Sequence, residues 1–234
     1  MKVTLLRVGK YKEIEEGLHD VDCSVTLVEF GKFNILYDTG GAWALSELLE
    51  SLATSGLSAT DITHVIGSHG HSDHIGCLSA FPHAFHFIGG DANLRNNYST
   101  LESSDSSSVD TARFFRDEMF TGGKFHHWGA NGIPLDDPRG KYGSIRLVKT
   151  PGHTSQCTSL LLEHQDGGIV LDGTSFSRIA IVGDLWDCVD DEDYYRTISQ
   201  LPLVQEESRS FVLKWGPDCI IPGHGAPFAP SDLG

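Results

Sequence analysis

One six-residue segment constrains this chain more than any other feature, because it concentrates metal-binding side chains at one point. It consists of His69, Gly70, His71, Ser72, Asp73 and His74. The segment follows the apolar run 62–66, which we expect to be a strand. Gly70 and Ser72 are small, so the backbone can fold with two histidines pointing one way and the last two side chains another. Imidazole and carboxylate suit zinc, iron or manganese. The alternative is a polar turn with surface histidines.

Three more candidate ligands occur in a matching local context. His153 follows the run 145–149 in Thr-Pro-Gly-His-Thr, Asp184 follows 179–182 in Val-Gly-Asp, and His224 follows 218–221 in Ile-Pro-Gly-His-Gly. Each comes after an apolar run and a glycine, which lets the backbone turn at the end of a strand. We therefore expect four ligand-bearing strand ends that meet at one metal site.

The apolar runs also predict the fold class. Strands are expected over 3–8, 24–30, 34–37, 62–66, 84–88, 145–149, 157–163, 168–171, 179–182 and 218–221. Leucines 45, 48, 49 and 52 recur at helical spacing, and Gly56 suits a helix end. Two helices are expected after Asp184; the second would bury the face formed by Val204, Ser208, Phe211, Val212 and Trp215. Two β-rich halves, each followed by helices, allow two sheets packed face to face with helices outside.

The 234 residues are expected to form a single domain over 1–234, with a loop insertion at about 91–143. That region is rich in serine, asparagine and glycine, which are typical of loops. Within it, residues 112–120 can form a short amphipathic helix. The sequence His126-His127-Trp128 is interpreted as a solvated loop, with substrate contact as the alternative.

Charge and cysteine content limit the partners and the compartment. The chain has 32 acidic and 17 basic residues and a formal net charge of -15, so it has no electrostatic reason to seek nucleic acid non-specifically. The charge fits a small-molecule substrate more easily. Five widely spaced cysteines without a CxxC pair indicate reduced thiols in a cytosolic or nuclear compartment. We see no signal peptide and no transmembrane segment.

The HxHxDH run, followed by a distant histidine, an aspartate and a final histidine, resembles the signature of the metallo-β-lactamase superfamily. The resemblance extends from about Ser24 to Phe228 and implies an α/β fold, a four-layer αββα sandwich with metals at one edge. It implies two zinc ions as cofactors, with iron or manganese possible. The ligand sets it implies are His69, His71 and His153 for one ion, and Asp73, His74 and His224 for the other, with Asp184 bridging both. Asp73 and Asp184 would be the catalytic carboxylates. Asp38, in Asp-Thr-Gly-Gly, would support the site.

Further stretches, among them DTGGAW, QEESR and IIPGHGAPF, resemble one group within that superfamily. That group is associated with zinc-dependent endoribonuclease action on histone pre-mRNA 3′ ends and lies near the glyoxalase II-like hydrolases. The resemblance implies RNA as the substrate and a homodimer, with hydrolysis of small thioesters or lactones as the alternative. A non-catalytic metal-binding protein and a mono-iron oxygenase are further alternatives.

Several other residues are expected to be structural. His64 and His86 lie in apolar strand patterns and are interpreted as packed, hydrogen-bonded histidines. Cys77 and Cys157 are interpreted as small buried hydrophobes. The acidic run 190–193 is interpreted as a solvated helix start.

Overall fold

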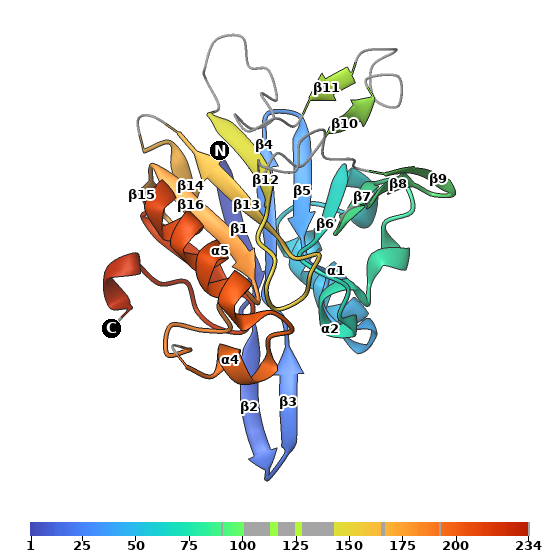
Figure 1. Cartoon of the computed structure of the whole chain (residues 1–234). Helices are drawn as coiled ribbons and strands as arrows, with labels where there is room; N and C mark the ends of the chain where they lie inside the picture. Colours follow the sequence, from blue (N-terminus) through green and yellow to red (C-terminus); the bar gives the residue numbers. More distant parts are fainter. Residues whose placement is uncertain are drawn as a thin grey trace.

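The computed structural model describes residues 1–89, 91–100, 113–116, 125–127, 143–164, 167–191 and 193–233. Its larger sheet has nine strands in the order β15-β14-β1-β4-β5-β6-β7-β8-β9 (Figure 1). In chain order these strands are β1 (Lys2–Arg7), β4 (Val25–Phe30), β5 (Phe33–Tyr37), β6 (His64–Gly67), β7 (Phe85–Ile88), β8 (Asp91–Leu94), β9 (Asn97–Thr100), β14 (Ile169–Leu171) and β15 (Thr174–Phe176).

The smaller sheet has four strands in the order β12-β13-β16-β17. They are β12 (Ser144–Lys149), β13 (Thr158–Glu163), β16 (Arg178–Gly183) and β17 (Cys219–Pro222). Two separate hairpins pair β2 (Lys10–Glu15) with β3 (Leu18–Asp22), and β10 (Arg113–Arg116) with β11 (Phe125–His127). The α-helices are α1 (Leu45–Thr54), α2 (Ser72–Ile75), α4 (Tyr195–Ile198) and α5 (Pro202–Trp215), and short 3-10 turns cover Ala42–Ala44, Ala59–Asp61, Leu78–Ala80 and Pro230–Asp232.

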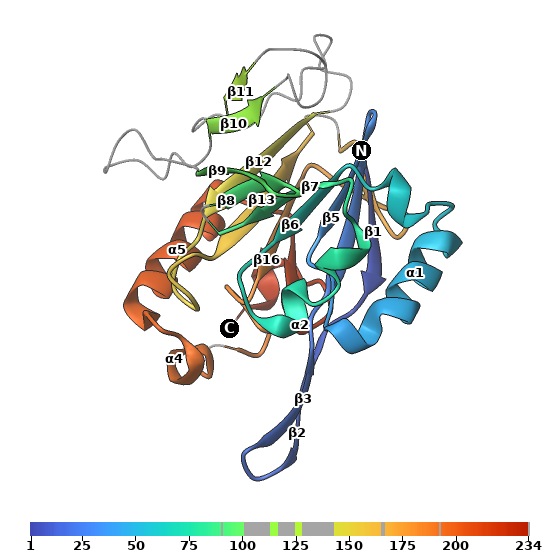
Figure 2. The ribbon, with the colours of Figure 1, turned by 90° about the vertical axis from the view of Figure 1, so that its right-hand side faces the viewer.

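Three hydrophobic clusters define four layers, as Figure 2 shows. The largest cluster lies between the two sheets and includes Tyr37, Ile66, Leu160 and Ile181. A second packs α1 against the outer face of the larger sheet. A third packs α5 against the outer face of the smaller sheet. The predicted αββα sandwich is therefore confirmed, and the strands predicted from apolar runs match the observed ones to within about two residues.

The pairing directions bring several strand ends to one edge. β5 and β6 are parallel, β16 and β17 are parallel, and β12 and β16 are both antiparallel to the intervening β13. The carboxyl ends of β12, β16 and β17 therefore share one edge of the smaller sheet. Thr158 at the start of β13 donates its backbone N–H to the carbonyl of Ser68 just beyond β6, at 2.9 Å. This contact joins the two sheets beside the strand ends that carry the candidate ligands.

Two local predictions were wrong, and one element was not predicted. Residues 113–116 form strand β10, which pairs with β11, whereas a helix was predicted over 112–120. Residues 91–100, assigned to a loop insertion, form β8 and β9 and extend the larger sheet. The hairpin of β2 and β3 was not expected, since its strands lack an apolar face. Much of the proposed insertion lies outside the described residues.

Helix α5 also differs from its prediction. Its buried residues are Gln205, Ser208, Arg209 and Val212, whereas Phe211 is 40% exposed. The polar members of this face bind backbone carbonyls of other segments, and those contacts fix the rotation of the helix. Among the described residues, no helix is long and apolar enough to span a membrane.

Candidate metal centre

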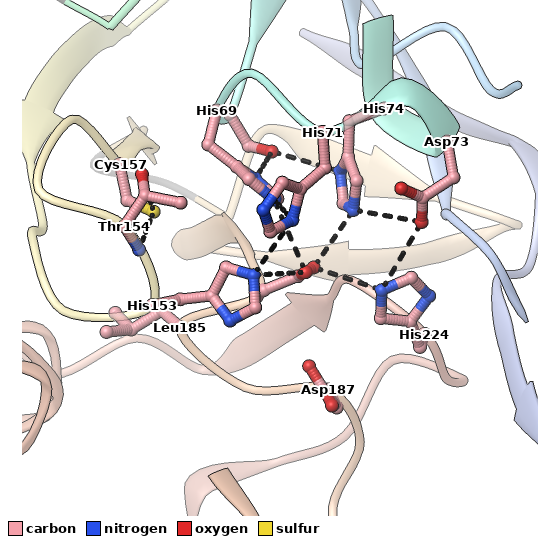
Figure 3. Close-up of polar contacts among 12 residues, drawn as sticks. His69, His71, Asp73, His74, His153, Thr154, Cys157, Leu185, Asp187 and His224 are labelled. Atoms are coloured by element: carbon pink, nitrogen blue, oxygen red, sulfur yellow. Dashed lines mark hydrogen bonds and ion pairs between the residues drawn. The ribbon is translucent and has the colours of Figure 1, made fainter. Parts of the chain in front are cut away.

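The predicted ligand side chains meet at the edge of the sandwich, as Figure 3 shows. The segment after β6 enters the short helix α2, so its side chains diverge as the small residues allow. The other three arrive on the loops after β12, β16 and β17. The structure thus brings together all seven residues that the sequence nominated: His69, His71, Asp73, His74, His153, Asp184 and His224.

The first donor group consists of three histidines and one carboxylate. His71 Nδ1 lies 2.8 Å from His69 Nε2 and 3.1 Å from His153 Nε2. The Oδ2 atom of Asp184 lies 3.5 Å from His69 Nε2 and 3.3 Å from His153 Nε2. One donor atom from each of the four residues falls within 4.8 Å of the others. This is a donor set of the kind that holds a divalent ion.

The second donor group lies on the other side of Asp184. The Oδ1 atom of Asp184 is 3.1 Å from His74 Nε2 and 3.2 Å from His224 Nε2. Asp73 Oδ2 is 3.5 Å from His74 Nε2 and 3.8 Å from His224 Nε2. Because its two oxygens face different groups, Asp184 is the residue the two groups share. Gly223 makes this approach possible, since a Cβ there would lie 2.1 Å from Asp184 Oδ1.

Hydrogen bonds behind the donor atoms fix the histidine rings. Asp38 Oδ2 accepts a hydrogen bond from His74 Nδ1 at 2.8 Å, and Asp38 Oδ1 accepts one from the Ser68 backbone at 2.6 Å. The carbonyl of Asp22, at the end of β3, accepts a hydrogen bond from His224 Nδ1 at 2.9 Å. The Nδ1 atom of each ring is therefore engaged, which leaves Nε2 as the atom directed at the site and as the donor that a metal would bind. Asp38 adopts φ +59°, a strained conformation of the kind that clusters at functional sites.

The ionisable side chains of the site shift one another's pKa values. Burial opposes ionisation of Asp184, but His74, His224 and His69 outweigh it and hold the pKa of this carboxyl well below its usual value. Burial also opposes charge on His224, yet Asp184 raises the pKa of that imidazole to about 9. At His69, burial dominates and moves the pKa well below the usual value. A buried carboxylate beside several imidazoles is therefore balanced by positive charge at the second donor group.

The donor atoms are better placed to bind divalent ions than to form hydrogen bonds with one another. His74 Nε2 and Asp184 Oδ1 are both buried and have no hydrogen-bond partner among the described residues. Such atoms are costly to bury unless a cation or a donor reaches them. The imidazole nitrogens of His69, His71 and His153 converge to within 2.8–3.1 Å of His71 Nδ1. Metal binding by this His/Asp cluster accounts for both observations.

Three residues that contact the site were missed in the sequence. Asp187 is buried, and one of its oxygens lies within 4.8 Å of donor atoms of Asp184 and His224. Burial, reinforced by Asp184, raises the pKa of Asp187 to about 8. Gln205 Nε2 donates to the Asp184 carbonyl at 2.9 Å, and Arg209 Nε donates to the Leu185 carbonyl at 2.6 Å. The spacing Asp184-Leu-Trp-Asp187 and the i, i+4 pair on α5 were the available signals.

Most of the structural interpretations are confirmed, and one is wrong. His64 Nδ1 lies 2.7 Å from the hydroxyl of Thr63, and His86 Nε2 donates to the Phe81 carbonyl at 2.9 Å. All five cysteines are free, and Cys77 and Cys157 are buried. The acidic run 190–193 is not simply solvated: Asp191 is 2% exposed, because it pairs with Arg209 at 2.6 Å. The side chains of residues 126–128 lie outside the described part of the chain.

A groove of about 760 Å³ opens beside the first donor group. Its lining includes Gly70, His71, Lys149, Thr154 and Gln156. The volume lies in the range typical of small-molecule sites. Because His71 belongs to both the groove and the donor cluster, the groove adjoins the first donor group.

A family model for the metallo-beta-lactamase superfamily matches residues 19–171. The chain belongs to this superfamily of metal-dependent hydrolases. It is similar to metallo-beta-lactamase domain-containing protein 1 of Xenopus laevis, with 36% identity over 97% of this chain and 80% of that protein. The protein of the same name from Homo sapiens is 34% identical over 86% of this chain and 62% of that one. A crystal structure from Thermotoga maritima superposes with a TM-score of 0.60 at 20% identity, covering 98% of this chain and 99% of the other.

Proposed function

We propose that this chain is a hydrolase with a dinuclear metal centre. The observation that carries the proposal is the placement of Asp184 between two donor groups, with one oxygen facing each. The first ion would be held by His69, His71 and His153, and the second by Asp73, His74 and His224. Zinc is the proposed metal, because tetrahedral sites of imidazole and carboxylate are typical of it. Iron and manganese bind the same ligand types.

Two bound divalent ions would make hydroxide available near neutral pH and would stabilise negative charge on the substrate. The chain's own residues supply the remaining functions. The side chain of Asp73 is 18% exposed, against 4% for Asp184, so Asp73 is the carboxylate placed to orient the attacking water. Asp38 and the Asp22 carbonyl hold His74 and His224 in the tautomer that a metal requires.

For the substrate, we propose an RNA phosphodiester, such as that at histone pre-mRNA 3′ ends. The support is the resemblance of several stretches to a group associated with that cleavage. With a net charge of -15, the surface supplies little general attraction for RNA. The metals would therefore provide much of the affinity for the scissile phosphate, and cleavage by the isolated chain should show little sequence preference.

A second candidate is a small thioester or lactone. The groove beside His71 favours it, since its volume of about 760 Å³ matches a small ligand. The groove also carries both Lys149 and Asp91, so it offers polar groups of opposite charge to a bound molecule.

A hydrolysis screen of the zinc-loaded protein distinguishes these substrates. It compares a histone pre-mRNA fragment, a scrambled strand of equal length, a glutathione thioester and a lactone, with His69→Ala as the control. Metal-dependent cutting of both strands at similar rates supports the RNA proposal. Rapid hydrolysis of the thioester or lactone alone moves the function to the second candidate. Failure of all four substrates with the metals bound would contradict both substrate proposals.

A further inference from the structure

Asp187 is a buried carboxyl group whose two oxygens have no hydrogen-bond partner among the described residues. The residue is 3% exposed. Burying a carboxylate without a donor or a cation is costly, so native proteins rarely retain such a group without a function. A partner for this side chain therefore has to come from outside the described residues.

The carboxylate of Asp187 points into the metal centre. Figure 3 shows it on the same side of the site as His224. One donor atom from each of these three residues lies within 4.8 Å of the other two. Asp187 thus approaches the second donor group from the side opposite Asp73 and the helix α2 (Figure 3).

The backbone fixes this orientation. The Asp187 carbonyl accepts a hydrogen bond from the backbone N–H of His224 at 2.7 Å. Its own N–H donates to Asp191 Oδ2 at 3.0 Å. Asp191 is in turn held by Arg209 at 2.6 Å. These contacts anchor the loop on both sides, so the backbone that carries the Asp187 side chain is fixed relative to His224.

We propose that Asp187 is an additional carboxylate donor to the metal ion held by Asp73, His74 and His224, bound directly or through one water. The inference rests on the proposed dinuclear centre and adds a residue to it. A cation at this position satisfies the orphaned oxygens of Asp187 together with the orphaned Nε2 of His74 and Oδ1 of Asp184. It also separates two carboxylates, Asp184 and Asp187, that would otherwise repel each other in a buried site.

The test is a metal titration of chelator-treated protein, comparing wild type, Asp187→Asn and Asp190→Asn. Asp190 is exposed on the same loop, so its variant makes the same charge change away from the site. Zinc is titrated against a competing chelator, and cobalt absorption spectra report the coordination of each equivalent. In Asp187→Asn, the affinity for the second equivalent should fall about 10–100-fold, with a changed spectrum for that equivalent only. Asp190→Asn should match wild type.

The same samples separate the possible failures. Wild type that saturates at one zinc per chain overturns the dinuclear centre and this inference together. Wild type with two equivalents, and Asp187→Asn with the same two affinities and spectra, overturns the role of Asp187 alone. Metal-free Asp187→Asn should melt no lower than metal-free wild type, because the side chain makes no hydrogen bond in the described structure. A lower melting temperature in that comparison would indicate a structural role and would also overturn the inference.

Discussion

Helix α1 buries Leu48 and Leu52 against the larger sheet, whereas helix α5 buries Gln205, Ser208 and Arg209 beside Val212. The two helices occupy equivalent outer layers of the sandwich (Figure 2). The α1 leucines pack with the apolar side chains of one core cluster. The α5 polar groups instead bind carbonyls, such as the 2.7 Å contact from Ser208 Oγ to Pro151.

This difference separates a helix that stabilises the fold from one that also positions the side chains of the metal centre. Ser208 contacts the loop that carries His153, and Gln205 contacts the backbone of Asp184 itself. Buried hydrogen bonds between polar groups favour one specific arrangement of the segments that they join. Helix α5 therefore acts as a brace for the metal centre, while α1 contributes apolar burial.

Replacement of Arg209 should have the largest effect. Arg209→Met leaves Asp191 buried without its 2.6 Å partner and removes the hydrogen bond to the Leu185 carbonyl. We expect the free energy of unfolding to fall by about 3–5 kcal/mol, and metal affinity to fall with it. Urea denaturation and zinc titration measure the two effects. Lys214→Met, an exposed change on the same helix, is the control. A loss below about 1 kcal/mol would contradict the brace.

Leu52→Ala tests the other helix. Leu52 is fully buried, so truncation should cost about 2–5 kcal/mol of unfolding free energy. Because Leu52 packs within the apolar cluster on the outer face of the larger sheet, zinc stoichiometry and turnover per folded molecule should not change. Leu49→Ala, at a position that is 37% exposed, should cost clearly less. Loss of the second zinc in Leu52→Ala would remove the distinction between the two helices.

A smaller effect is expected at Gln205. Gln205→Met keeps the side-chain length but loses the hydrogen bonds to the carbonyls of Asp184 and Leu185. Stability should fall by about 1–3 kcal/mol, and zinc affinity by about 10-fold. Glu206→Met, on the exposed side of the same helix turn, provides the matched control. Equal zinc affinity in the two variants would show that α5 braces the loops without affecting the ions.

The last prediction concerns pH and lies outside both helices. Burial lowers the pKa of His64 to about 3, so the unfolded chain, with a pKa near 6.5, binds a proton that the folded chain excludes. Stability is therefore complete above about pH 6.5 and is lost as the pH falls toward 3. The slope should be about 1.4 kcal/mol per pH unit. Chelator-treated His64→Gln should lose this part of the slope in urea titrations from pH 7 to 5; an unchanged slope would contradict the assignment.

The sequence predicted the parts of this molecule that depend on local pattern. Apolar runs ending in glycine located β6, β12, β16 and β17, and the ligands followed from their positions after those runs. Prediction failed where the structure of a segment depends on a contact with residues that are distant in the sequence. The buried face of α5 is polar because its partners are carbonyls up to 57 residues away, as for Ser208 and Pro151.

The same limit explains two other errors. Asp191 resembles a solvated residue until its partner Arg209, eighteen positions further on, is placed beside it. The hairpin of β2 and β3 has mostly exposed residues, so no apolar periodicity marks it, yet its last residue supplies the carbonyl that orients His224. Long-range hydrogen bonds of this kind leave no signal within a short window of sequence.

The donor side chains come from both sheets, and this affects the order of events during folding. Four of them lie in the six-residue segment 69–74 that follows β6. Asp184 and His224 follow strands of the other sheet, more than 100 residues later in the chain. Bringing such distant segments together is the slow part of folding for β-rich topologies. A nascent chain can therefore present the first histidines early, while the shared carboxylate arrives only when the sheets dock. The metal centre is therefore complete only after the two sheets have docked.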